Sequence, residues 1–243
     1  MGIERQYRWY MARMYGGKRR YLRRMARRYT ALALVSCGFV AVLAAVCLIA
    51  ILAHDLPPAL LAAPVLLAAV PGYFFRRRRG YRYGIRGEEA VARALAALDD
   101  RHRVFSSLVL PGARGDIDHV VVGPGGVWVL ETKNYAGDIA CTGDRWARRR
   151  NGEWKAMERS PGRQAIDNAR RLASFLEGCA VAVPVEPVVV LANSNARIRC
   201  KDPAVPVVMR GELASSLSVR KPRLNAKDIR LIAEFIRKSA RLA

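Results

Sequence analysis

The chain has 243 residues, which allows one or two domains, and carries 42 Lys and Arg against 20 Asp and Glu, a formal net charge of +22. This charge suits a polyanionic partner, either acidic lipid or nucleic acid. The alternative is that the basic flanks only set membrane topology and the remaining charge aids solubility. The five cysteines form no CxxC pair and have no histidine at ligand spacing, so we expect buried free thiols rather than a zinc site or disulfides.

Residues 1–30 are basic and aromatic. They hold ten Lys and Arg, six Tyr and Trp, and one acid, Glu4. The pair Gly16-Gly17 would interrupt a helix. We predict a cytoplasmic segment that lies on the membrane surface, with a separate nucleic-acid-binding arm as the alternative.

Two uncharged apolar runs follow, at residues 31–53 and 59–75. A helix rises about 1.5 Å per residue, so the first run can cross a hydrocarbon core about 30 Å thick. The second run is shorter, and Pro64 and Pro71 are expected to kink it. Basic residues lie on both outer flanks and none lies in the link 54–58, so the positive-inside rule places both ends in the cytoplasm.

The runs therefore predict a transmembrane hairpin in the inner (cytoplasmic) membrane, a multi-pass anchor with anionic lipid at its basic flanks. A cleaved signal peptide is disfavoured, because a second apolar run follows the first. A buried hairpin in a soluble core also stays open, as does a single span with a re-entrant second segment. Residues 76–83 are predicted to be a basic linker, and residues 84–243 a soluble cytoplasmic domain.

Residues 84–243 are predicted to contain both helices and strands. A helix is predicted from residue 86, followed by strands at 104–110, 116–122 and 127–133 and by further strand and loop over 137–157. A helix over 160–176, short strands at 187–191 and 205–209, a short helix at 211–217 and a last helix capped by Asn225 complete the chain. This order predicts an α/β domain with a mixed central sheet flanked by helices, in which the two short strands are central.

Acidic residues gather on the second and third of these strands. Alternation places Asp116 and Asp118 on one face of the first, and Glu131 and Lys133 on one face of the next. The four-residue connection 123–126 makes the two strands neighbours. If the faces coincide, Asp118, Glu131 and Lys133 converge.

Such a group can bind a metal ion. Asp118, Glu131 and the carbonyl of residue 132 supply the hard oxygen ligands that Mg²⁺ or Mn²⁺ prefers, and Glu88, on the buried stripe of the first helix, could add a further ligand. The ion would polarise a phosphodiester and lower the pKa of a bound water. Lys133 could orient or activate that water and stabilise the negative charge that develops. The alternative is an ion pair of Lys133 with Glu131 or Asp118 at the strand end.

The spacing Asp118-x12-Glu131-Thr132-Lys133 resembles the signature of the restriction-endonuclease-like PD-(D/E)xK superfamily. The segments 86–91, 115–127, 129–137 and 160–164 resemble the nuclease-related domain (NERD) family, and the resemblance covers about residues 84–195. It implies a restriction-endonuclease-like fold, with Asp118 and Glu131 as metal ligands, Lys133 as catalytic lysine and Glu88 as the helix acid. It also implies Gln164 as a supporting polar residue, and Asp116 as a second aspartate that binds water or orients its neighbours.

These observations predict a membrane-anchored, Mg²⁺- or Mn²⁺-dependent nuclease that hydrolyses phosphodiester bonds in DNA. One alternative is a catalytically inactive module that binds nucleic acid or protein at the membrane. Another is a structural membrane-associated protein whose basic segments bind anionic lipid.

Overall fold

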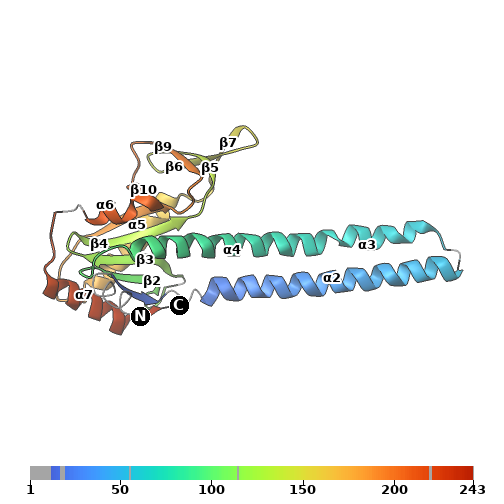
Figure 1. Cartoon of the computed structure of the whole chain (residues 1–243), viewed down its shortest axis with the longest axis horizontal. Coiled ribbons are helices and arrows are strands. Elements are labelled where there is room, and N and C mark those ends of the chain that lie inside the picture. The colour runs from blue at the N-terminus through green and yellow to red at the C-terminus, as the bar shows by residue number, and fades with distance from the viewer. Residues whose placement is uncertain (1–11, 17–19, 55, 114, 219–220, 243) are drawn as a thin grey trace, which may run out of the picture. The chain divides into compact units, whose positions relative to one another are not determined.

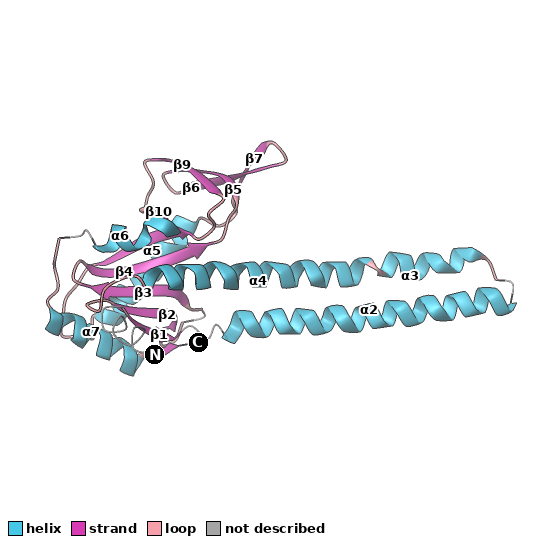
Figure 2. Ribbon diagram, viewed as in Figure 1, coloured by secondary structure: helices cyan, strands magenta, loops and turns pink. Residues whose placement is uncertain are grey.

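The computed structural model describes residues 12–16, 20–54, 56–113, 115–218 and 221–242. The chain divides into two compact units: Arg20–Ile85, and a second unit that combines Met1–Arg19 with Arg86–Ala243. The first unit is helical and the second is built on β-sheets (Figure 2). Each unit is described by itself below.

The helical unit contains α2 (Arg20–His54), η2 (Pro58–Leu61), α3 (Ala62–Leu67) and the first part of α4 (Ala69–Leu95). The segments Leu22–Ala53 and Pro58–Leu95 are long and apolar enough to cross a membrane, by length and composition alone. Large apolar side chains on these helices are exposed, among them Leu34, Val35, Phe39, Val42, Ile49, Leu52, Val65 and Leu66. Exposed apolar surface of this extent is typical of membrane or protein interaction sites.

Helix α4 joins three segments that the sequence analysis had separated. Residues 76–83, predicted to be a linker, are helical, and the helix begins at Ala69 rather than near residue 86. The physical reason is that the arginines here form helices well, and Gly80 and Gly84 cost only about 1 kcal/mol each, so no residue ends the helix. Pro71 lies in its first turn, where a missing N–H group breaks no hydrogen bond.

The prediction that residues 1–30 lie on a membrane surface is wrong for residues 13–16 and stays a prediction for residues 20–30. Residues 20–30 begin α2, and β1 (Arg13–Gly16) pairs in parallel with β2 (Arg103–Val109). The Tyr15 ring stacks on Phe105 with centroids 4.9 Å apart, and Ala12 is buried. This packing draws the strand onto the sheet. Residues 1–11 and 17–19 lie outside the described part of the chain.

The central sheet is mixed, as predicted, and has the order β1-β2-β3-β4-β8-β10, with β11 (Arg241–Leu242) paired to β2 (Figure 1). Its other strands are β3 (Ile117–Gly123), β4 (Gly126–Lys133), β8 (Val185–Leu191) and β10 (Val207–Met209). Strands β2, β3 and β4 are antiparallel neighbours, whereas β8 is parallel to both β4 and β10. The prediction that both short strands are central holds for β8 and is wrong for β10, which ends the strand order.

Helices cover both faces of this sheet. Val120, Val122, Val127 and Val129 pack in one buried cluster with α5 (Pro161–Leu176) and α7 (Ala226–Ser239). The alternate residues Val121, Trp128 and Leu130 pack in another cluster with the end of α4 and with α6 (Leu213–Ser218), which follows η3 (Arg210–Glu212). This period-2 division confirms the α/β architecture and sets which strand residues face α5.

A second, four-stranded sheet was not predicted. Its order is β7-β6-β5-β9, formed by β5 (Gly137–Thr142), β6 (Arg145–Arg150), β7 (Glu153–Ala156) and β9 (Ala196–Lys201). Asn151-Gly152 forms the turn between β6 and β7, with φ values of 51° and 85° that suit a tight hairpin. Strand β9 was missed because its sequence is mostly polar, and its parallel partner β5 lies far away along the chain.

The five cysteines are free, but the prediction that they are buried holds fully only for Cys141. Cys37 and Cys200 are exposed. Burial, followed by the neighbouring Cys200, raises the pKa of the Cys141 thiol to about 12. At neutral pH Cys141 is therefore an unreactive thiol.

The last helix, α7, has a side-chain cap at its N-terminus, and the contribution of this cap to stability can be measured. The Asn225 side chain accepts hydrogen bonds from the N–H groups of Lys227 and Asp228, and the Asp228 carboxylate accepts from the N–H of Asn225. We expect Asn225→Ala to lower the free energy of unfolding by about 1 kcal/mol, because these helix donors lose their partners. Thermal unfolding checks this, with Asn225→Asp as the control that keeps an acceptor. An unchanged Tm for the alanine variant would contradict it.

Candidate functional site

Strand β4 separates from β3 before it ends. Its antiparallel pairing with β3 begins at Gly123↔Gly126 and ends at His119↔Leu130, whereas its parallel pairing with β8 continues to Lys133↔Leu191. Asp118 occupies the place where the two strands part. Its Oδ2 accepts a hydrogen bond of 2.8 Å from the backbone N–H of Thr132. The Asp118 side chain thus replaces a backbone acceptor for the Thr132 N–H. This hydrogen bond holds the Asp118 carboxylate beside Glu131.

Glu131 is buried, with 2% of its surface exposed. Its Oε1 lies 2.6 Å from the Nζ of Lys133, and its Oε2 accepts a hydrogen bond of 3.2 Å from the Nδ2 of Asn168. Because residues 131 and 133 share a face of β4, the ion pair forms within one strand. Both carboxylate oxygens therefore have a donor, one from β4 and one from α5.

Lys133 also contacts α5. Its Nζ donates a hydrogen bond of 2.9 Å to the Oε1 of Gln164, and its side chain is 19% exposed. Gln164 and Asn168 lie four residues apart on one face of α5, so both reach β4. Asn168 was missed by the sequence analysis, although its spacing from Gln164 on a predicted helix could have indicated it.

The start of α5 is fixed by its own cap. The Ser160 Oγ accepts a hydrogen bond of 3.1 Å from the N–H of Arg163, and Pro161 occupies the first turn. Arg163 in turn forms an ion pair of 3.1 Å with Asp144, just before β6. These contacts set where α5 begins and therefore which of its turns faces β4.

Burial and like charge oppose the ionisation of the carboxylates in this site. Burial raises the pKa of Asp118 well above its ordinary value, and the charges of Glu131 and Glu88 raise it further. Burial also raises the pKa of Glu131, against the opposing effect of Lys133. Burial alone would lower the pKa of Lys133, but the charge of Glu131 and its hydrogen bond outweigh it and hold that pKa above the usual range.

The charges of the two remaining acids of the predicted set, Glu88 and Asp116, raise the pKa values of Asp118 and Glu131, respectively. Glu88 is buried on α4, and Asp116 is exposed immediately before β3, where its charge raises the pKa of Glu131. Gly87 allows α4 to approach the strand end: a Cβ at this position would lie 2.6 Å from the Cβ of Asn134. A larger residue would push this turn of α4, and Glu88 with it, away from Asp118.

The donors fit a divalent ion in chemistry but are not prearranged as a complete ligand set. Within the described part of the chain, no group of three or more His, Cys, Asp or Glu side chains is close enough to hold a metal ion as it stands. The carboxylates of Asp118 and Glu131 are nevertheless hard oxygen donors, and both have raised pKa values because burial and like charge oppose their ionisation. A bound cation would relieve that cost.

A simple ion pair accounts for only part of this arrangement. Among the residues that the structure describes, Lys133 pairs with Glu131 and not with Asp118. The pair therefore neutralises the Glu131 carboxylate, while burial and the charges of Glu131 and Glu88 still oppose the ionisation of Asp118. A purely structural pair would not require a second buried carboxyl, Asp118, at the same strand end.

The remaining residues with nucleic-acid-binding chemistry divide into buried and exposed ones. Trp146 is buried in the core, so it cannot stack on a base, whereas Trp154 on β7 is exposed. The Arg148 guanidinium lies over the Tyr135 ring, 4.5 Å from its centroid, and donates to the carbonyl of Ala136. His119 is buried and hydrogen-bonded to Ser106 at 2.9 Å, which indicates a structural role.

Comparison with known proteins found one matching family. The family model described as nuclease-related domain (NERD) matches residues 83–192. No curated protein and no solved structure matches the chain. The matched range runs from α4 to just past β8 and contains all of the site residues named above.

Proposed function

Because residues 83–192 are a nuclease-related domain, we propose that this chain is a membrane-anchored, divalent-metal-dependent nuclease that hydrolyses phosphodiester bonds in DNA. The observation that carries the proposal is the meeting of Asp118, Glu131 and Lys133 where β3 and β4 part. In this proposal the central sheet has the restriction-endonuclease-like arrangement. A non-catalytic module would keep the same fold and bind nucleic acid or protein without cutting.

Each residue of the site has a role in this proposal. Asp118 and Glu131 would hold Mg²⁺ or Mn²⁺, with Glu88 and Asp116 as additional acids nearby. When bound, the ion supplies a Lewis acid that polarises the phosphodiester and lowers the pKa of water. Asp118 is oriented for this purpose by the N–H of Thr132, and Asn168 orients Glu131.

Lys133 acts as a cation rather than as a base. Its pKa is raised by Glu131, so its ammonium group is protonated at neutral pH. A protonated Nζ stabilises the negative charge that develops on the phosphoryl oxygens during attack. Gln164 accepts one hydrogen bond from this group and so limits the directions in which Lys133 can point.

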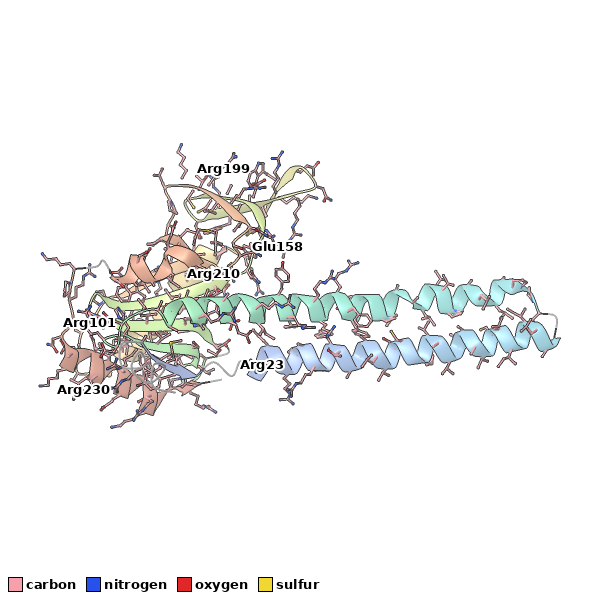
Figure 3. The ribbon with its side chains drawn as sticks, in the orientation of Figure 1. Arg23, Arg101, Glu158, Arg199, Arg210 and Arg230 are labelled. Atoms are coloured by element: carbon pink, nitrogen blue, oxygen red, sulfur yellow. The ribbon has the colours of Figure 1, made fainter. Side chains whose placement is uncertain are left out.

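The substrate assignment rests on charge. Residues 80–243 hold 28 Lys and Arg against 18 Asp and Glu. Arginines project from several elements of this unit, and Figure 3 labels Arg199 on β9, Arg210 in η3 and Arg230 on α7. A basic surface of this kind attracts the phosphate backbone and makes binding dependent on salt concentration.

The membrane assignment rests on the helical unit. Its two long apolar helices expose their apolar side chains, and arginines flank both outer ends. By the positive-inside rule, both ends lie in the cytoplasm, which makes the protein a multi-pass component of the inner membrane with a cytoplasmic nuclease domain. Extraction of membranes at alkaline pH tests this: the protein should stay in the pellet, and its release would contradict insertion.

Cleavage is best tested with the full-length protein in detergent. A fragment that begins at residue 80 would lack β1, which pairs with β2 in the central sheet. We expect the full-length protein to cut DNA with Mg²⁺ or Mn²⁺ and to stop when the ion is chelated, with RNA as a parallel substrate. Salt-dependent DNA binding without cleavage under either ion would support the non-catalytic module instead.

Gln164 is expected to act as a positioning residue. Gln164→Ala removes one acceptor from the Lys133 ammonium and should lower kcat about tenfold, with little change in KM. Ser174→Ala, an exposed position on the same helix, is the matched control and should leave kcat unchanged. A rise in KM with unchanged kcat would show instead that Gln164 contacts substrate in the ground state.

A further inference from the structure

The helical unit contains a cavity of about 670 Å³ among basic and aromatic side chains. The cavity is lined by Leu22 of α2 and by residues of α4, which are Tyr73, Arg76, Arg77, Gly80, Tyr81 and Gly84. All seven belong to the unit Arg20–Ile85. We propose that this cavity binds the headgroup of an anionic phospholipid.

The spacing along α4 builds the cavity. Tyr73, the Arg76-Arg77 pair, the Gly80-Tyr81 pair and Gly84 follow one another at intervals of three or four residues, so they share one face of the helix. A Cβ added at Gly80 or Gly84 would meet no atom within 4 Å. The two glycines therefore leave open space beneath a rim of arginine and tyrosine side chains.

Contacts within the unit orient the rim. The Arg77 Nε donates a hydrogen bond of 3.1 Å to the Tyr73 Oη, and its guanidinium lies 5.6 Å from the centroid of that ring. The Tyr81 ring stacks on Tyr29 of α2, with centroids 5.5 Å apart. The bond through Nε leaves the terminal N–H groups of Arg77 as the donors that suit a phosphate oxygen pair.

The charge of the helical unit predicts that the bound group is an anion. The unit Arg20–Ile85 holds ten arginines, no lysine and one acid, Asp55. Asp55 belongs to the link between the two apolar runs, far along the chain from the cavity, and none of the described residues that line the cavity is acidic. Among the residues that line the cavity, an anion would therefore meet two arginines and no carboxylate.

The position of the cavity along α4 decides the class of the occupant. Tyr73, which is 51% exposed, lies near the end of the apolar run 59–75, and Arg76 and Arg77 follow that run directly. Aromatic and then basic residues at the end of a span lie at the level of the lipid headgroups. A phospholipid places its phosphate at this level and its acyl chains beside the exposed apolar residues, whereas nucleic acid or free phosphate has no apolar part to occupy them.

This inference rests on the proposed insertion of the helical unit in a membrane. It goes further than a general attraction between basic residues and acidic lipid, because it assigns the contact to two of the four consecutive arginines. Arg76 and Arg77 line the cavity, whereas Arg78 and Arg79 do not. The two arginine pairs carry equal charge on the same helix. A specific site in the cavity predicts that lipid binding depends mainly on Arg76 and Arg77. A general attraction between basic residues and acidic lipid predicts that it depends equally on both pairs.

The test is native mass spectrometry of the full-length protein in detergent, titrated with phosphatidylglycerol or phosphatidylcholine. We expect one phosphatidylglycerol to be retained preferentially, and Arg76→Ala/Arg77→Ala to weaken its binding about tenfold or more. Arg78→Ala/Arg79→Ala should weaken it less than about threefold, the residual effect of charge at longer range. Gly80→Leu, which keeps every charge but fills the cavity, should weaken binding as the first pair does, and Gly72→Leu should not.

The lipid site would be overturned by equal weakening in the two arginine double variants, or by displacement of the lipid by inorganic phosphate or by duplex DNA. A different result would show that the helical unit does not insert in a membrane. The protein would then leave membranes at alkaline pH and stay in solution without detergent. A protein that inserts equally into bilayers of either lipid, yet retains neither selectively, would refute the lipid site alone.

Discussion

Lys133→Ala is expected to reduce DNA cleavage by about 10³-fold, and Glu131→Ala by a similar factor. The first change removes the ammonium group that would stabilise developing charge, and the second removes a proposed metal ligand together with the partner of Lys133. Rates of cleavage by the full-length protein in detergent, measured at saturating Mg²⁺ or Mn²⁺, check both. Lys155→Ala is the matched control, because Lys155 is an exposed lysine on β7 that should not affect the rate.

Loss of folding must be separated from loss of chemistry in this experiment. Lys133→Ala leaves the buried Glu131 without its cation, which is itself destabilising. Lys133→Arg keeps the charge and should retain the fold, with cleavage reduced because the guanidinium cannot reproduce the compact ammonium geometry. Circular dichroism and DNA binding of each variant report on folding. Unchanged cleavage in both alanine variants would reject the assigned site.

Asp118→Asn is expected to stabilise the metal-free protein at neutral pH, because asparagine cannot carry a buried negative charge. Burial and the charges of Glu131 and Glu88 raise the pKa of Asp118, so the folded state binds the proton more tightly than the unfolded state does. The stability that protonated Asp118 contributes is therefore fully present below pH 3.8, the ordinary pKa of an aspartate, and is lost as the pH rises through the raised pKa. Asparagine never ionises and can still accept the hydrogen bond from Thr132.

The measurement is the Tm of wild type and variant in detergent with a chelator, from about pH 4 to pH 8. The difference in Tm should be largest at neutral pH and shrink on acidification. Asp167→Asn, at a half-exposed position on α5, is the control and should show no such trend. A variant that is less stable than wild type at neutral pH would contradict the charge argument.

The same pair of proteins tests metal binding without relying on activity. Mg²⁺ or Mn²⁺ should raise the Tm of wild type, because a ligand that binds only the folded state stabilises it. The ion should raise the Tm of Asp118→Asn much less, since one carboxylate ligand is lost. Equal stabilisation of both proteins by the ion would place any bound metal elsewhere.

Local patterns in the sequence were enough to predict several elements. The start of α5 at Ser160-Pro161, the β3–β4 hairpin around Pro124-Gly125 and the cap at Asn225 each depend on residues only a few positions apart. Strand alternation likewise predicted that Glu131 and Lys133 share a face. These features follow from short-range sterics and side-chain period, which the order of the residues determines by itself.

Only the tertiary structure decided which distant segments meet. The pairing of β1 with β2 and of β9 with β5, and the continuity of α4 through residues 76–83, depend on contacts or missing helix stops that no short window shows. In the site, the separation of β4 from β3 places Asp118 on the N–H of Thr132, and the rotation of α5 brings Asn168 to Glu131. Strand pairing and helix rotation are decided by burial summed over the whole core, so local sequence patterns could not predict them.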